Sequence, residues 1–137
     1  MRAASIRQPW AWAIARGHRP VTNQDAPTAY RGPMLVHASM RVDLSSCHSP
    51  LIRSAGWDPA DPLATLGAVI AVAELTGVCS PGEVCECGPW AEEGSHHWRI
   101  SGVRALSRPV VALGRLGLWE PSAGLISNVH TMLALAP

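Results

Sequence analysis

Residues 67–78 read GAVIAVAELTGV (Gly67–Val78) and contain the longest apolar run of the chain. Such a stretch, rich in valine, isoleucine and alanine, predicts a buried strand, with Glu74 as its carboxylate. Shorter segments with strand character lie on both sides of it: Ala3–Ile6, which we expect at a sheet edge, Pro20–Gln24, Pro33–His37 and His97–Leu106. Short strands without regularly alternating helices favour a small barrel over a dinucleotide-binding fold.

Helical signals lie near the two ends of the chain. Pro9 precedes the segment Trp10–Arg16 and Gly17 follows it, as expected at the start and end of a helix. Apolar residues at helical spacing predict an amphipathic helix at about residues 122–135. We therefore expect an α+β fold, a small β-barrel with flanking helices, in a single domain over residues 1–137.

The segments between these elements are expected to be irregular. A proline interrupts the helical stretch Leu44–Ala55, while Trp57–Pro62 and Cys79–Gly94 predict loops. Arg108-Pro109 predicts a turn. After it, two glycines make Val110–Trp119 either a bent strand or a turn between short strands.

The composition excludes several classes of protein. Apolar residues make up 47% of the chain and charged residues 15%, which excludes wholesale disorder. No apolar run approaches the roughly 18 residues of a membrane-spanning helix. Because Met1–Ile6 also lacks the apolar segment of a signal peptide, we expect a cytoplasmic protein whose four cysteines are reduced.

The charge pattern restricts both the chemistry and the partners. All eleven basic residues are arginine, so no side-chain amine is present for Schiff-base or lysine general-base chemistry. Residues 1–68 carry a balance of +3 and residues 69–137 a balance of −2, within a net charge of +1. Any nucleic-acid contact must therefore come from a local patch, not from the overall field.

The segment Ser5–Trp10 combines an arginine, an amide and an indole where a helix is expected to begin. Arg7 could contact a phosphate and Gln8 a base edge, while Trp10 could stack on a base, as could Trp98 and Tyr30. The alternative is that Trp10 lies in the core and that Arg7 is a solvated charge.

Two further polar groupings follow along the chain. On the strand Pro20–Gln24 the side chains alternate, so Thr22 and Gln24 share one face while Asn23 lies on the other. Such a polar face either lines a cleft or is the solvent-exposed face of a sheet.

An Arg-Gly turn, with Arg31 as its cation, then leads into an apolar strand that ends near His37 and Ser39. This arrangement is typical of a functional site. The alternative is that His37 is a structural histidine with satisfied hydrogen bonds.

Taken in order, these segments resemble the ASCH family of small domains, which is related to the PUA superfold. The resemblance rests on Ser5–Trp10, on Thr22–Gln24, and on the pattern Arg-Gly-Pro…His-Ala-Ser within Arg31–Ser39. It extends over about residues 3–120, through Gly67–Leu75, Trp98, Pro109 and Gly117–Trp119. It implies a β-barrel with a cleft between the barrel and the first helix, which binds RNA, another nucleic acid or a modified nucleoside.

The family's cleft signature corresponds to Gly17, Arg19, Thr22 and Gln24, where arginine replaces the usual lysine and glutamine the usual arginine. Some bacterial members resemble amidohydrolases of N4-acetylcytidine that use a lysine, a threonine and a glutamate. By that resemblance Thr22 matches the threonine, and Glu74 would supply the carboxylate. Arg19 has no neutral form that could replace the lysine as a base.

The loop after the central strand carries a set of potential metal ligands. Cys79, Cys85 and Cys87, followed by His96 and His97, have the residue types of a zinc site, with His96 as the candidate histidine, although the spacing Cys-x5-Cys-x-Cys-x8-His differs from that of the common Cys-x2-Cys knuckle. The alternative is a loop of reduced cysteines. No other cofactor is expected.

We therefore predict a module that binds RNA or single-stranded nucleic acid, and no membrane. Its binding residues are predicted to be Arg7, Gln8, Trp10, Arg19, Thr22, Asn23, Gln24, Arg31, His37 and Ser39. One alternative is an amidohydrolase of N4-acylated cytidine-type nucleosides that uses Thr22 and Glu74, and another is a nuclease acting on the bound strand. A third alternative is an interaction domain in which the C-terminal helix docks a partner.

Overall fold

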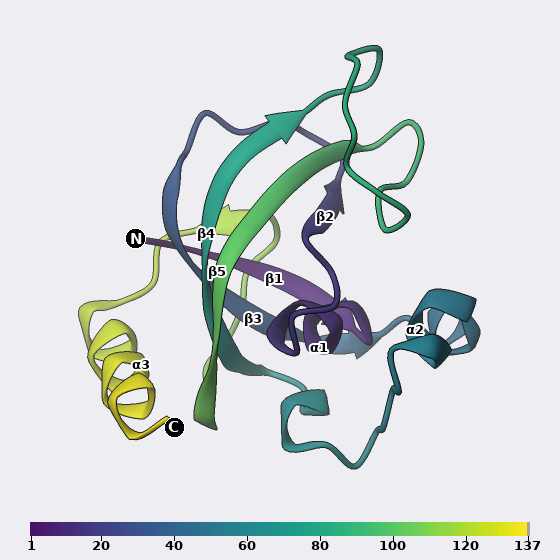
Figure 1. Cartoon of the computed structure of the whole chain (residues 1–137). Coiled ribbons are helices and arrows are strands. Elements are labelled where there is room, and N and C mark those ends of the chain that lie inside the picture. Colours follow the sequence, from purple (N-terminus) through teal and green to yellow (C-terminus); the bar gives the residue numbers. More distant parts are fainter. Residues whose placement is uncertain (137) are drawn as a thin grey trace.

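The computed structural model describes residues 1–136; Pro137, the last residue of the predicted domain, lies outside them. The fold is α+β, with one curled six-stranded sheet in the order β2-β5-β4-β3-β1-β6 (Figure 1). Its strands are β1 (Arg2–Gln8), β2 (Val21–Gln24), β3 (Gly32–Val42), β4 (Ala68–Cys79), β5 (His96–Val111) and β6 (Leu118–Trp119). Among the described residues only β1 and β3 pair in parallel, and α1 and β2 lie between them along the chain.

Short helices occupy the connections, and a longer one follows the sheet. They are α1 (Trp10–Ala15), α2 (Pro50–Ser54) and α3 (Ala123–Leu135), with 3₁₀ turns η1 (Ser45–His48) and η2 (Pro62–Ala64). These bounds confirm the predicted helices at the two ends and the interruption of the helical stretch near residue 50.

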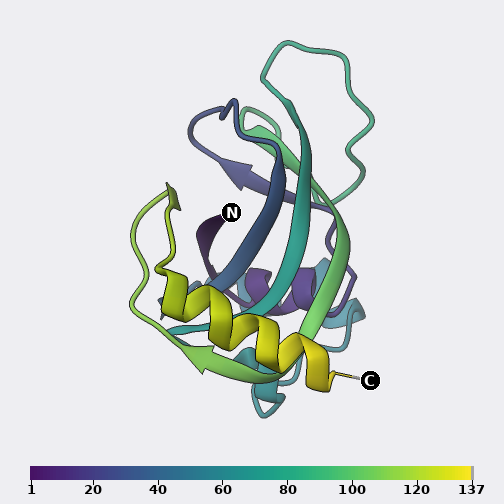
Figure 2. The ribbon, with the colours of Figure 1, turned by 90° about the vertical axis from the view of Figure 1, so that its left-hand side faces the viewer.

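The sheet is apolar on both faces, and each face has its own helix (Figures 1 and 2). Along β3, Met34 and Val36 belong to the core cluster that contains α1, whereas Leu35 between them belongs to the cluster that contains Val129 of α3. This is the period-two alternation of a strand that is buried on both sides. It explains why β4 has a continuous apolar run, and the predicted buried strand at Gly67–Val78 is confirmed.

One prediction about the sheet is wrong, and the predicted barrel is confirmed in part. The segment at Ala3–Ile6 is not at an edge, because Trp119 and Leu118 of β6 pair with Ala3 and Ala4 on the side away from β3. The predicted barrel is an open, curled sheet among the described residues, with β2 and β6 as its two edge strands.

The predicted turn at Arg108-Pro109 is also wrong, since β5 continues to Val111 and still pairs with β4 there. Proline lacks a backbone N–H and is tolerated in a strand whose outer side is unpaired. The outer neighbour β2 pairs with β5 only between His96 and Arg99, so the strand around Pro109 meets that condition.

Two further observations bear on the sequence predictions. No helix among residues 1–136 is long and apolar enough to cross a membrane. Cys79 and Cys85 form a disulfide, while Cys47 and Cys87 are free, so the prediction that all four cysteines are reduced does not describe this structure.

Candidate functional site

A cavity of about 1190 Å³ opens beside α1 and β2. Its walls come from the end of β1, the start of α1, β2, the loop after β2, the η1 region and the loop between β4 and β5. Six of the predicted binding residues line it: Arg7, Trp10, Arg19, Thr22, Asn23 and Gln24. The structure therefore brings residues from two of the predicted groupings, Ser5–Trp10 and Gly17–Gln24, into one cavity.

Arg19 is the most unusual group in this cavity. Arg19 is only 5% exposed, and its Nε is buried without a hydrogen-bond partner among residues 1–136. Its Cζ lies 4.7 Å from the ring centroid of Trp10. Burial lowers the pKa of Arg19 to about 10, with Glu92 acting in the opposite direction, so the guanidinium is still charged at neutral pH. A buried cation normally has a paired carboxylate, and this one lacks an ion pair within the described chain.

The turn after α1 places Arg19 in the cavity. Gly17 adopts a φ of +80°, which a residue with a side chain rarely adopts, and its N–H donates to Ile14. The next two amides, of His18 and Arg19, both donate to the carbonyl of Ala13. The chain therefore reverses directly after the helix, and Arg19 lies between α1 and β2.

Two half-buried indoles form the aromatic part of the lining. The rings of Trp10 and Trp90 meet edge to face, with centroids 6.2 Å apart. Trp98 also lines the cavity, but it is only 4% exposed and its Nε1 donates to the carbonyl of Ala26 at 2.9 Å. The predicted stacking role of Trp98 is therefore replaced by a structural one.

The two faces of β2 have different partners, as the alternation predicted. Gln24 donates from Nε2 to Oγ1 of Thr22 at 2.9 Å, so these two side chains lie together. Asn23 donates from Nδ2 to the carbonyl of Trp90 at 3.1 Å and accepts from the amide of Glu92 at 2.9 Å. Asn23 therefore holds the loop between β4 and β5 at the wall of the cavity.

Two predicted binding residues lie outside the cavity lining. Gln8 is buried, and its amide donates to the carbonyls of Leu63 and Thr65 and accepts from the backbone N–H of Trp12. Arg31 is exposed and donates to carbonyls of its own turn. The prediction that Gln8 reads a base edge is wrong, because its side-chain amide is already hydrogen-bonded to the backbone of α1 and of the η2 region.

His37 and Ser39 are also outside the lining. His37 is 1% exposed and connects Ser5 to the carbonyl of Ala112. Ser39 donates to the carbonyl of Arg41. The structure therefore supports the alternative that His37 is a structural histidine with satisfied hydrogen bonds.

Glu74 does not meet Thr22. Thr22 pairs with Trp98 across the sheet, and Trp98 shares a face with Ile100, which pairs with Leu75. Glu74 adjoins Leu75 and is exposed on the opposite face, outside the cavity lining. The predicted catalytic pair of an amidohydrolase is therefore not brought together.

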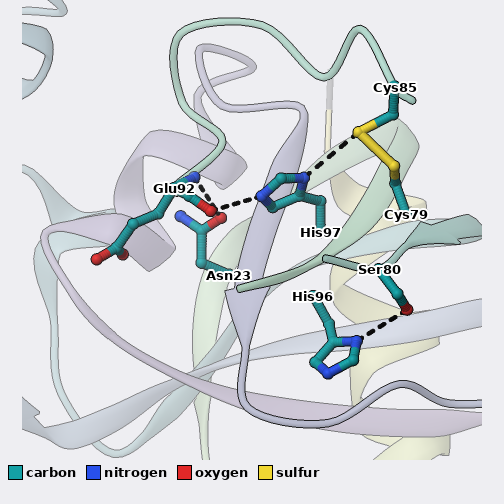
Figure 3. Close-up of a disulfide and its surroundings, with 7 residues drawn as sticks. All are labelled: Asn23, Cys79, Ser80, Cys85, Glu92, His96 and His97. Carbon is teal, nitrogen blue, oxygen red and sulfur yellow. Dashed lines mark hydrogen bonds between the residues drawn. A yellow bond between two sulfur atoms is a disulfide. The ribbon is translucent and has the colours of Figure 1, made fainter. Parts of the chain in front are cut away.

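The loop between β4 and β5 carries a second cluster of side chains, around the Cys79–Cys85 disulfide (Figure 3). The ligand atoms of Cys79, Cys85, Cys87 and His97 all lie within 4.8 Å of one another, so the group could hold a metal ion. The histidine predicted for this set, His96, instead has its Nδ1 2.8 Å from Oγ of Ser80. Adjacent residues of a strand project to opposite faces, which is why only one of the two histidines reaches the sulfurs.

Some cavity residues were missed by the sequence analysis. They include Asp43 on the η1 side and Trp90 and Glu92 in the loop before β5. Hydrogen bonds, chiefly from Ser46, lower the pKa of Asp43 and keep it ionised. An indole in a loop rich in glycine and glutamate was the signal that could have identified Trp90.

In comparisons with known proteins, the chain matches no family model and no curated protein. The resemblance to the ASCH family therefore stays a prediction from the sequence motifs.

Proposed function

We propose that the protein binds RNA or another single-stranded nucleic acid and takes one nucleotide unit into the cavity with a phosphate at Arg19. The observation that carries this proposal is the buried guanidinium of Arg19, which has an unpartnered Nε and lacks an ion pair within the described chain. The oxygens of a phosphate match the geometry of a guanidinium, which can donate two hydrogen bonds to them.

The other lining groups support a nucleotide as the ligand. Trp10 and Trp90 supply aromatic surface for a base, and stacking on such surfaces tolerates every base because each has a π-face. The amide of Gln24 lies on the same wall and can bond to polar atoms of a base or a sugar. A cavity of about 1190 Å³ is somewhat larger than the roughly 300–1,000 Å³ of small-ligand sites, so it has room for a nucleotide unit.

The charge of the lining limits how much phosphate backbone can be bound. Arg7 and Arg19 face three acidic residues, Asp25, Asp43 and Glu92, in the same lining. This balance favours one or two phosphates over a long basic track. We therefore expect a shallow salt dependence, unlike that of proteins that contact many phosphates.

The test is a fluorescence titration of the full chain with a short single-stranded RNA, with the six tryptophans as the probe, at low and at moderate salt. We expect Arg19→Ala to weaken binding by about 10-fold or more and to reduce the salt slope by about 0.7, the value for one phosphate on a single strand. The matched control is Arg108→Ala, which removes an exposed arginine outside the cavity lining.

Two results would contradict the proposal. One is an Arg19→Ala variant that binds RNA with wild-type affinity and slope, and the other is an equal loss in Arg108→Ala. Folding of both variants is checked by circular dichroism, so that a loss of binding can be distinguished from a loss of structure.

A further inference from the structure

We propose that Cys79, Cys85, Cys87 and His97 bind one Zn²⁺ ion when the cysteines are reduced, and that this ion fixes the loop between β4 and β5. The four ligand atoms already lie within 4.8 Å of one another. A tetrahedral site with Zn–S bonds of about 2.3 Å and Zn–N bonds of about 2.0–2.1 Å needs ligand atoms roughly 3.5–3.8 Å apart. Small movements of the side chains would therefore complete the site.

A disulfide accounts for only two of these four residues. Cys79 and Cys85 are bonded to each other, but Cys87 is a buried free thiol and His97 faces the same sulfurs. Three cysteines with one histidine are a common ligand set of structural zinc sites. A metal site explains why all four side chains converge.

The orientation of His97 is that of a metal ligand (Figure 3). Its Nε2 lies 2.6 Å from the carbonyl oxygen of Glu92, and because a carbonyl only accepts, Nε2 carries the proton. The neutral ring then presents the lone pair of Nδ1, which lies 3.7 Å from Sγ of Cys85. Histidines that bind metals usually donate their other ring N–H to a carbonyl or carboxylate in this way.

The position of the ligands in the fold indicates a structural ion. Cys79 ends β4 and pairs directly with His97 of β5, so two ligands are held by the sheet. Cys85 and Cys87 come from the loop, which the ion would fasten to the sheet. Four protein ligands leave no open coordination position, so we expect no metal-bound water and no metal catalysis.

Zinc and the disulfide exclude each other, because zinc binds thiolates. Reduction of the Cys79–Cys85 disulfide by a thiol or phosphine takes two electrons and two protons and yields two thiols. Binding of Zn²⁺ then displaces the thiol protons of the three cysteines into solvent. The oxidised protein keeps only Cys87 and His97 as ligands, and we expect it to bind zinc far more weakly.

The site is tested by titrating the reduced, metal-free full chain with Co²⁺ and then with Zn²⁺. We expect one equivalent of Co²⁺ to produce the visible absorption of a tetrahedral ion together with thiolate-to-metal charge transfer, and Zn²⁺ to abolish both. Zinc is also expected to raise the melting temperature and to slow cleavage at Glu83 and Glu86 by a glutamate-specific protease, since both residues are exposed in the loop. A reduced chain that takes up neither ion overturns the proposal.

Matched variants identify the ligands. His97→Ala and Cys87→Ser should weaken Co²⁺ binding by more than the roughly 10- to 100-fold that loss of an outer partner causes. The neighbouring histidine and the free cysteine elsewhere serve as controls, so His96→Ala and Cys47→Ser should bind like the wild type. Equal effects of His97→Ala and His96→Ala, or of Cys87→Ser and Cys47→Ser, would contradict the assignment.

One variant keeps the test informative if the others fail to fold. His97→Cys replaces the nitrogen ligand by a thiolate, and we expect it to retain one Co²⁺ with stronger charge-transfer absorption. An unchanged spectrum would show that His97 is not a ligand. None of these measurements involves nucleic acid, so they test the zinc site independently of the proposed nucleotide binding.

Discussion

At the scale of single residues, a chain of hydrogen bonds connects elements far apart in the sequence. Trp119 donates from Nε1 to Oγ of Ser5 at 3.1 Å, and Ser5 lies 3.1 Å from Nδ1 of His37. His37 is 2.7 Å from the carbonyl of Ala112, which only accepts, so its Nε2 carries the proton and Nδ1 accepts from Ser5. Each polar group in this chain is therefore satisfied, and β6 and the loop before it are fastened to β1 and β3.

Gly114 packs against this chain and leaves no room for a side chain. A Cβ at this position would lie 2.6 Å from Nδ1 of His37 and 2.6 Å from Oγ of Ser5. We expect Gly114→Ala to lower the free energy of unfolding by about 1–3 kcal/mol, because the hydrogen-bonded chain must shift. Denaturant unfolding measures the change.

The control for this prediction is Gly124→Ala. Gly124 is an exposed residue of α3, and a Cβ there would make only an ordinary contact, 4.0 Å from Oγ of Ser122, so alanine should stabilise the helix by up to about 0.5–1 kcal/mol. A Gly114→Ala variant as stable as the wild type would show that the loop around residue 114 adapts without cost.

At the scale of secondary-structure elements, Asp61 joins α1 to η2. It accepts hydrogen bonds from Nε1 of Trp12 at 2.9 Å and from Nε of Arg16 at 2.9 Å, and it caps η2 through the amide of Leu63. Arg16, which donates to both oxygens of Asp61, is the main reason that the pKa of Asp61 falls from its ordinary value of 3.8 to about 2.

The shift predicts how acid affects stability. A carboxyl whose pKa is lower in the folded state stabilises the fold above its unfolded pKa, and this contribution is lost as the pH falls toward the folded value. We expect the free-energy difference between wild type and Asp61→Asn to be about 1–2 kcal/mol at pH 6 and to shrink between about pH 4 and pH 2. A difference that stays constant with pH would contradict the assigned role of the Asp61 carboxylate.

At the scale of the whole molecule, one sheet connects two apolar clusters. Ile14 of α1 is buried on one face and Val129 of α3 on the other, and both are 0% exposed. Because the same strands contribute side chains to both clusters, loss of either cluster should weaken the sheet and thereby the other.

We therefore expect a single cooperative unfolding transition. Ile14→Ala should destabilise it by about 2–5 kcal/mol and Val129→Ala by about 1.5–3 kcal/mol. Chemical denaturation followed by both tryptophan fluorescence and far-ultraviolet circular dichroism should give coincident curves for each variant. Two separate transitions in Val129→Ala would mean that α3 and its cluster unfold independently.

Local sequence signals correctly predicted the elements that depend on neighbouring residues. The apolar run at Gly67–Val78 identified β4, and the Pro9 and Gly17 signals bounded α1. Six of the predicted binding residues line one cavity, because the polar side chains around α1 and β2 are close in the sequence as well as in space. These features follow from periodicity and from the backbone preferences of proline and glycine.

Features that depend on the pairing of distant segments follow from the three-dimensional fold and have no local signal in the sequence. The pairing of Trp119 with Ala3 removes β1 from the edge of the sheet, and the edge position of residues 104–111 lets β5 continue through Pro109. A shift of one residue in a strand reverses the face of a side chain, so sequence spacing alone selected His96 where the sheet presents His97 to the cysteines. The burial of Arg19 with an unpartnered Nε, and without a close ion pair in the described chain, is likewise decided by the fold and is not revealed by composition and charge.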